Sequence, residues 1–360
     1  MKKVLAVMCA AVMLSGCSVP FVPETEIEMP QKYELYRENE VEDPIDCREE
    51  FAWYEKFCDD LLQLNSTVVI DEFVKKSDIR AAFVQLKDDC PEIFWLDSYY
   101  YYPKSDSVEL QFGFIDGIDE DNLPEMFAEL EDAADEIIAS LPGEDADVYD
   151  RILAAHDALI DRCEYDYAGM ESGGNGKFAT SYGALVEGKA ICSGYAEGFG
   201  YLMKRMGVEA GVCRGYMAEG FHAWNYVMLN GDYYWIDTTW DDESSRAPSR
   251  EYFMFNDDIM LRTRSISSEQ NYVPKCIPLD NYYLVRDGAY FTEYDLEAVK
   301  DYVSGCSGDY CEIMFADYDT YCDAIEHLLG KHEILKVADT KNATYYRDDR
   351  MFVIQIDLRK

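Results

Sequence analysis

The spacing of apolar positions predicts alternating helices and strands in the first part of the chain. Apolar residues recur every three to four positions where a helix buries one face, and every second position where a strand does. Helical spacing covers residues 47–64, 78–90 and 124–141, and strand spacing covers 66–70, 99–102 and 108–115. We therefore predict a small α+β domain over residues 47–145. It contains no histidine and shows no candidate chemistry.

The central part of the chain predicts two helices and a hairpin. Residues 147–162 are amphipathic, and a second helix begins at Cys192 and stops at Gly207. Two strand patterns, 221–229 and 232–240, flank Asn230-Gly231, a dipeptide that favours a two-residue turn. Pairing Leu229 with Asp232 places Trp224 opposite Asp237 and His222 opposite Thr239. His222 and Asp237 then share one face of the hairpin as diagonal neighbours.

After the hairpin the pattern predicts a polar loop and then a second small α+β domain. Strand spacing covers residues 251–255, 282–285, 311–315 and 351–358, and helical spacing covers 296–303 and 321–329. We place the central core at residues 146–265 and the C-terminal domain at 266–360.

Cys192 carries the candidate chemistry because it stands at the start of a predicted helix. Unpaired amide groups and the helix dipole stabilise a thiolate at this position. A thiolate nucleophile needs a base and a group that orients the base, and His222 and Asp237 follow it in the chain. The alternative is three unrelated structural residues. His156, alone on its helix, is interpreted as structural.

Three further features bear on this site. The backbone amide of Cys192 is a candidate oxyanion donor, and the Tyr182 hydroxyl is a second candidate. Gly194 and Gly198 lie four residues apart and leave one face of the helix bare, so we expect a sheet to pack closely there.

The first seventeen residues predict export and lipidation. Lys2 and Lys3 precede an apolar run, Val4 to Leu14, that is too short to span a bilayer. Small residues then lead to Cys17, as in the lipobox of bacterial lipoproteins. We predict a signal peptide at 1–16, a lipid anchor on Cys17, and an acidic tether over 17–46. The alternative is an ordinary secretory signal cut near Gly16.

Charge and cysteine spacing exclude several classes of function. The net charge of −40 repels nucleic acid and anionic lipid head groups. None of the twelve cysteines forms a CxxC pair, which removes the usual zinc-ribbon and thioredoxin interpretations. Cys306, Cys311, Cys322, His327 and His332 fit no common metal spacing, so a structural or disulfide role is favoured there.

Two segments resemble the transglutaminase-like superfamily, and are most similar to exported bacterial members of its cytokinesis-protein branch. They are GKAICSGYAEGFGYLMKRMGVEAGVCRGY, from residue 188, and GFHAWNYVMLNGDYYWIDTTWDD, from residue 220. The resemblance covers about residues 150–260. It implies a papain-like α+β core, in which a nucleophile helix packs on an antiparallel sheet, with Cys192, His222 and Asp237 as the catalytic positions.

The resemblance implies acyl transfer without a metal or organic cofactor. The predicted signal peptide and the anchor at Cys17 predict that the protein lies at the outer face of the bacterial cytoplasmic membrane. The expected substrate is a protein, a peptide or a cell-wall peptide, and the resemblance leaves hydrolysis and cross-linking open. The alternative is a surface binding or assembly lipoprotein whose triad is vestigial. Nucleic acid is not an expected partner.

Overall fold

The structure is a computed structural model that describes residues 28–32, 46–173, 175–242, 249–270 and 272–359. The predicted signal peptide, Cys17 and most of the tether lie outside the described residues. The described residues divide into two compact units: one lies within Arg37–Met217 and Phe221–Leu279, and the other lies within Met1–Tyr36, Ala218–Gly220 and Asp280–Lys360. Each is described by itself below. The predicted α+β class is confirmed.

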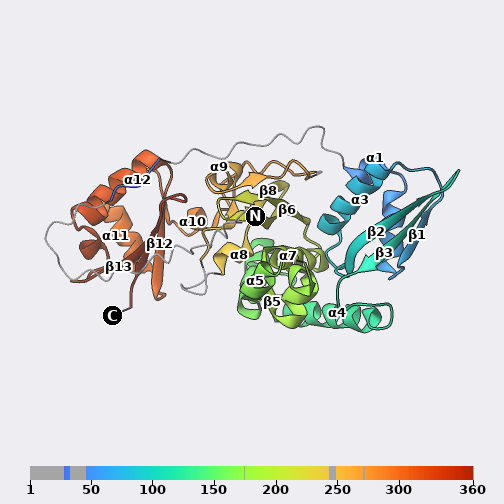
Figure 1. The fold of residues 1–360 in the computed structure, drawn as a ribbon. Coiled ribbons are helices and arrows are strands. Elements are labelled where there is room, and N and C mark those ends of the chain that lie inside the picture. Colours follow the sequence, from blue (N-terminus) through green and yellow to red (C-terminus); the bar gives the residue numbers. More distant parts are fainter. Residues whose placement is uncertain (1–27, 33–45, 174, 243–248, 271, 360) are drawn as a thin grey trace, which may run out of the picture. The chain divides into compact units, whose positions relative to one another are not determined.

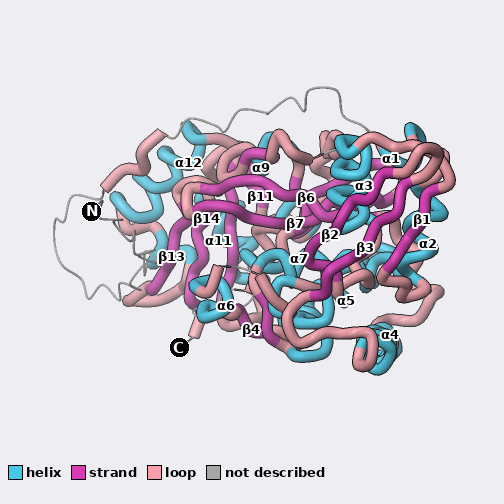
Figure 2. The backbone as a smooth tube through the Cα atoms, turned by 45° about the vertical axis from the view of Figure 1, so that its right-hand side comes forward, coloured by secondary structure: helices cyan, strands magenta, loops and turns pink. Residues whose placement is uncertain are grey.

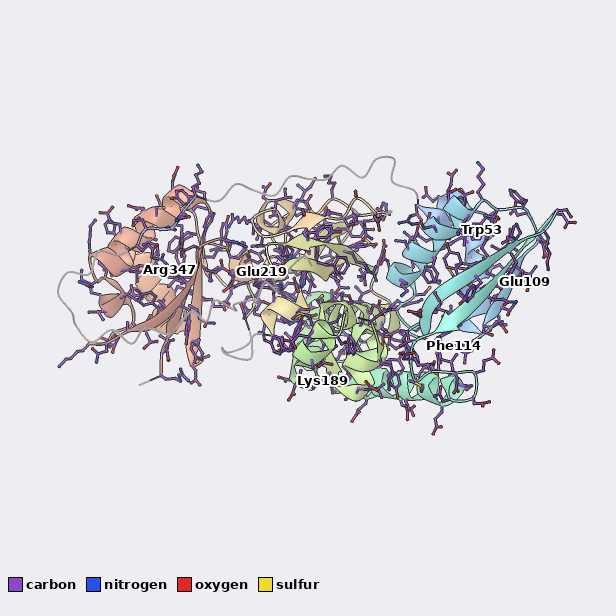
Figure 3. All side chains as sticks on the ribbon, in the orientation of Figure 1. Trp53, Glu109, Phe114, Lys189, Glu219 and Arg347 are labelled. Carbon is purple, nitrogen blue, oxygen red and sulfur yellow. A yellow bond between two sulfur atoms is a disulfide. The ribbon has the colours of Figure 1, made fainter. Side chains whose placement is uncertain are left out.

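The first part of the larger unit is a three-stranded antiparallel sheet with helices on one face (Figure 2). Phe57 and Phe83, from two of the helices, both pack on Phe112 of the central strand, with ring centroids 6.0 and 6.2 Å away. Glu109 and Phe114 mark the two ends of that strand (Figure 3). The elements are α1 (Cys47–Glu50), α2 (Tyr54–Leu62), β1 (Thr67–Ile70), α3 (Lys76–Asp89), β2 (Leu96–Pro103) and β3 (Val108–Phe114).

The second part of the larger unit packs helices on a five-stranded sheet of order β10-β6-β7-β8-β9. Figure 1 shows α5 and α7 side by side beneath β6 and β8. The main elements are α4 (Leu123–Ser140), α5 (Val148–Arg162), α7 (Cys192–Arg205), β6 (Ala210–Met217), β7 (Gly220–Leu229), β8 (Asp232–Ile236), α8 (Thr238–Asp241), β9 (Phe253–Phe255), α9 (Asp257–Met260) and β10 (Ser265–Ile266).

Short elements fill the segment between α5 and α7. A parallel two-stranded ladder joins its two ends, and a π-helical turn precedes Gly188, whose φ of 67° ends that turn. These elements are β4 (Glu164–Tyr165), α6 (Tyr167–Glu171), η1 (Lys177–Ala179), η2 (Gly183–Glu187) and β5 (Lys189–Ala190).

Polar contacts join the first part of the larger unit to α7 and to the turn before it. Lys204, in the last turn of α7, lies 2.6 Å from a Glu92 carboxylate oxygen. The Ser181 hydroxyl donates to the Pro91 carbonyl at 2.5 Å, and the Gln270 amide donates to Asp88 at 2.8 Å. The preceding part thus contacts the last turn of α7, the turn before α7 and the segment that follows β10.

The smaller unit is a four-stranded sheet of order β11-β12-β14-β13 with helices packed on it. A disulfide joins Cys306 and Cys311. The predicted strand at 282–285 is wrong: this run forms one helical turn, closed by the Asp287 amide on the Tyr283 carbonyl at 2.9 Å. The elements are α10 (Tyr283–Arg286), β11 (Tyr290–Phe291), α11 (Leu296–Gly305), β12 (Tyr310–Phe315), α12 (Tyr318–Ile325), η3 (Glu326–Gly330), α13 (Ile334–Val337), β13 (Thr344–Asp348) and β14 (Val353–Asp357).

Two expectations about membranes and metals concern the whole chain. Among the described residues, no helix has the length and apolar character needed to cross a membrane. In the same residues, no group of three or more His, Cys, Asp and Glu side chains is arranged to hold a metal ion.

Candidate active site

Cys192 is the first residue of α7. Ile191, its N-cap, is extended and offers no side-chain oxygen to the amides of the first turn. Those amides therefore point towards the thiol end of the helix without a capping side chain. Lys204 and Arg205 occupy the last turn, and Gly207 follows with a φ of 72°, so the helix begins and ends where the sequence predicts. The Cys192 side chain is buried, with 8% of the residue exposed.

The two glycines of α7 do not face the sheet, and this prediction is wrong. A Cβ atom on Gly194 would lie 2.6 Å from the Phe178 carbonyl oxygen, and one on Gly198 would lie 3.0 Å from the Ala184 Cβ. Both glycines let the segment between α5 and α7 pack closely on the helix. The sheet instead meets α7 at Ala196, which packs with Val212 and Ala223.

The hairpin of β7 and β8 has the predicted register at its turn. Leu229 pairs with Asp232, and the ladder continues to the pair of Asn225 and Ile236. The predicted pairing of His222 with Thr239 is wrong because β8 ends at Ile236 and a short helix begins. Asp237 caps that helix by accepting the Trp240 amide at 3.3 Å.

His222 and Asp237 meet directly even though the ladder ends before Asp237. His222 Nε2 lies 2.7 Å from Asp237 Oδ2, and both residues are buried. Because Asp237 takes Nε2, Nδ1 is the ring nitrogen left for the sulfur, and His222 and Cys192 are close enough to shift each other's pKa. The structure thus brings the three predicted residues together in the order sulfur, imidazole, carboxylate.

The three groups shift one another's protonation. Burial by itself favours the neutral thiol, but the hydrogen bond and charge of His222 outweigh it and lower the pKa of Cys192. Burial also opposes an imidazolium, yet Asp237 and Cys192 raise the pKa of His222 to about 9. Burial would raise the pKa of Asp237, but His222 and Arg264 lower it to about 2. These directions favour a thiolate–imidazolium pair at neutral pH.

Two residues at this site were missed by the sequence analysis. Arg264 is fully buried and contacts Asp237 Oδ2 through both Nε, at 3.2 Å, and Nη2. The half-buried Trp240 stands edge-on to the His222 ring, with centroids 6.3 Å apart. No spacing rule relates Arg264 to Asp237, 27 residues earlier. Trp240 lies within the second quoted segment, three residues after Asp237, but nothing in the sequence assigns it a role.

The last two residues of the same motif hold helices in place. His156 is buried, and its Nε2 lies 3.0 Å from Asp241 Oδ2 while its Nδ1 lies 2.9 Å from Asp157 Oδ1. The Tyr195 hydroxyl donates to Asp242 at 2.5 Å. His156 thus tethers α5, and Tyr195 tethers α7, to the segment that follows Asp237. The structural interpretation of His156 agrees with these contacts.

Tyr182 points away from the thiol. Its hydroxyl donates to Glu129 of α4, and its ring stacks on Phe94 with centroids 5.1 Å apart. The prediction of an oxyanion donor at Tyr182 is therefore wrong. The Cys192 amide, at the first helical position, remains the donor that the helix start supplies.

With this geometry in view, residues 135–239 match the family model of the transglutaminase-like superfamily. This segment of the chain is therefore similar to that superfamily. The match includes Cys192, His222 and Asp237. None of the curated proteins compared with the chain matches it significantly.

Solved structures give two further comparisons. A crystal structure of a TGase aligns with 12% sequence identity and a TM-score of 0.30 over 51% of this chain and 53% of that one. A proposed cysteine protease from Cytophaga hutchinsonii aligns with 16% identity and a TM-score of 0.26 over 39% of this chain and 61% of that one. The chain therefore spans between half and two thirds of the length of these structures.

Proposed function

We propose that this protein is a cysteine acyl-transfer enzyme in which Cys192, His222 and Asp237 act as a catalytic triad on amide or peptide bonds. One observation carries the proposal. His222 lowers the pKa of a thiol at the start of a helix, and its Nε2 lies 2.7 Å from a buried carboxylate oxygen of Asp237. A structural cysteine in an apolar core has a raised pKa instead, as Cys163 does, where burial raises the pKa to about 12.

The proposed reaction has two halves. The Cys192 thiolate attacks the amide carbonyl carbon, and the C–N bond breaks as His222 gives its proton to the leaving amine. The acyl group is then held as a thioester. Water attacks the thioester and gives an acid, or an amine attacks it and gives a new amide; His222 accepts the proton from either and the thiolate is restored. We favour hydrolysis.

The Cys192 amide would donate to the developing oxyanion, and Asp237 holds the imidazole with its Nδ1 towards the sulfur. Trp240 covers one edge of the imidazole. This cover limits water around the pair and strengthens the attraction between thiolate and imidazolium.

Selective alkylation tests the proposal. The full chain is treated with iodoacetamide from pH 5 to 10, and the modified cysteines are identified by peptide mapping. We expect Cys192 to react at pH 6 at a rate at least about tenfold above that of an ordinary thiol, because lowering its pKa raises the thiolate fraction. Cys163 in the same molecule is the control and should stay unmodified.

Turnover completes this test. Cys192→Ala should abolish the release of ammonia or of new amino termini from cell-surface extract, and Cys163→Ala should leave it unchanged. If Cys192 reacts no faster at pH 6 than an ordinary thiol and Cys192→Ala changes no turnover, the enzyme proposal fails. Incorporation of an added primary amine, in place of new amino termini, would show cross-linking.

We also propose that the chain is anchored at the cell surface through a lipid on Cys17. The basis is the order of Lys2 and Lys3, the apolar run and the small residues before Cys17. Cys17→Ser should move the protein from the membrane fraction to the soluble fraction. Unchanged membrane association in that variant would exclude this anchor.

A further inference from the structure

Arg264 adds a fourth charged side chain to the buried cluster of Cys192, His222 and Asp237. It lies between α9 and β10, and its side chain is fully buried. Its Nη1 donates to Thr263 Oγ1 at 2.8 Å, and its Nε and Nη2 both donate to Asp237 Oδ2. That oxygen also faces His222 Nε2. The guanidinium and the imidazole therefore share one carboxylate oxygen.

The surroundings of Arg264 favour a cation. The Tyr252 and Phe255 ring centroids lie 4.6 and 5.4 Å from its Cζ atom, and those of Trp224 and Trp240 lie 5.9 and 6.0 Å away. Aromatic faces attract a cation at such distances. Trp224 also stacks on the His222 ring, at 5.9 Å. The same two indoles thus border both cations.

Charge balance gives Arg264 a role. A thiolate, an imidazolium, an ionised Asp237 and a guanidinium sum to zero, and so does the state in which the thiol and imidazole are neutral. Without Arg264 both states would leave one net negative charge in a buried site, which is costly. The cluster can therefore exchange a proton between Cys192 and His222 without a change in its net charge.

We propose that Arg264 is a positioning residue for the triad that acts through Asp237. It keeps the carboxylate ionised, fixes the oxygen that faces His222, and shares that oxygen so that the imidazole can still release its proton to a leaving amine. This inference rests on the proposed acyl-transfer function. The titratable groups near the Asp237–Arg264 pair include Cys192, His222, Cys213 of β6 and Tyr252.

The test compares alkylation of Cys192 against pH in the full chain and in Arg264→Gln, Asp237→Asn and the double variant. In Arg264→Gln we expect the acid limb to move to higher pH by about one unit, which lowers the rate at pH 6 about tenfold. If Arg264 acts through Asp237, adding Arg264→Gln to Asp237→Asn should change that rate less than about twofold. A profile that overlays the wild type, or an equal change in both backgrounds, overturns the proposal.

Arg264→Lys keeps the test decisive if Arg264→Gln does not fold. Lysine keeps the charge but loses the fork that places two donors on one oxygen. We expect Cys192 in Arg264→Lys to be alkylated at pH 6 at least about threefold more slowly than in the wild type. If Arg264→Gln folds, the rate in Arg264→Lys should lie between those of the wild type and Arg264→Gln. An unchanged rate would overturn the positioning role.

A second readout separates this proposal from the acyl-transfer proposal. The midpoint of the His222 side-chain titration, followed by nitrogen-15 NMR, depends on Asp237 and Arg264 and needs no substrate. If wild-type Cys192 is unreactive at pH 6, the proposed function fails. A His222 titration midpoint that differs between the wild type and a folded Arg264 variant would still support the role of Arg264. An unchanged midpoint overturns it.

Discussion

Two buried histidine–aspartate pairs stand at the two ends of α8, and their geometry is nearly the same. His222 Nε2 lies 2.7 Å from an oxygen of Asp237, which caps the helix. His156 Nε2 lies 3.0 Å from an oxygen of Asp241, which is the last residue of α8. Both histidines are buried, and the carboxylates beside them raise the pKa of each. A histidine–aspartate contact is therefore not by itself a sign of catalysis.

The difference lies at the second ring nitrogen. His156 Nδ1 meets Asp157, so the imidazole is held between two carboxylates that both favour its protonated form. The other nitrogen of His222 is left for the Cys192 thiol. Both ring nitrogens of His156 face carboxylates, and these stabilise the protonated ring. One ring nitrogen of His222 is left for the sulfur, with which it can exchange a proton. The third group, not the histidine–aspartate pair, distinguishes the proposed catalytic pair from the structural one.

The largest expected effect comes from replacing each histidine in turn. His222→Gln should lower the alkylation rate of Cys192 at pH 6 by about a hundredfold or more, because the thiol loses the partner that lowers its pKa. His156→Gln should leave that rate within about twofold and lower the free energy of unfolding by about 1–3 kcal/mol. The measurements are alkylation kinetics and urea denaturation of both variants. Equal loss of thiol reactivity in the two variants would remove the distinction between the pairs.

Replacing the two aspartates should distinguish the pairs in the same way as replacing the histidines, with a smaller change in the alkylation rate of Cys192. Asp237→Asn keeps a hydrogen-bonding group but loses the charge that supports the imidazolium, so we expect the alkylation rate at pH 6 to fall about tenfold. Asp241→Asn should cost about 3 kcal/mol of unfolding free energy, since it breaks a buried ion pair, without a change in that rate. A slower thiol in Asp241→Asn, in protein shown to be folded, would contradict this assignment.

The sequence predicts one pair better than the other for a physical reason. Cys192 is marked by a local helix start, and His222 and Asp237 are related by a hairpin whose register follows from Asn230-Gly231. Such short-range rules place side chains relative to their own element. The partner of His156 is 85 residues away, and no local rule connects α5 with the end of α8.

The errors at the site follow from the same limit. The hairpin pattern continues past Ile236, but the Asp237 side chain caps a helix there, which local pairing rules do not weigh against strand pairing. The spacing of Gly194 and Gly198 correctly indicates close packing, yet helical spacing gives no direction, and the neighbour is the segment before α7. Arg264 reaches Asp237 only through the folded arrangement of β8 and α9.

A smaller effect should appear in the pH dependence of stability. His222 has a folded-state pKa of about 9, above the usual 6.5, so its contribution is complete below pH 6.5 and is lost as the pH rises to 9. The protein with His222 should have a higher free energy of unfolding than the His222→Gln variant at pH 6. We expect this difference to shrink by roughly 1–3 kcal/mol between pH 6 and pH 9.5. A Cys192→Ser background removes the opposing contribution of the thiolate.

The same series tests His156, whose pKa is also raised, so its contribution is complete below pH 6.5 and is lost above its own folded-state pKa. The difference in unfolding free energy between the protein with His156 and the His156→Gln variant should therefore also shrink as the pH rises. Urea denaturation at each pH measures both differences. A difference that widens with pH for either histidine would mean that the folded protein holds that imidazole neutral.

The smallest effect tests what the second carboxylate beside His156 contributes. Asp157 is partly exposed and is also bound by Arg250 at 2.7 Å, so Asp157→Asn should cost no more than about 1 kcal/mol. The variant leaves Asp241 as the one carboxylate on the His156 ring, which should lower the His156 titration midpoint measured by NMR. Alkylation of Cys192 serves as the control and should not change. If the midpoint of His156 stays where it is, Asp241 alone holds the proton, and the second carboxylate is not what distinguishes this pair from His222 and Asp237.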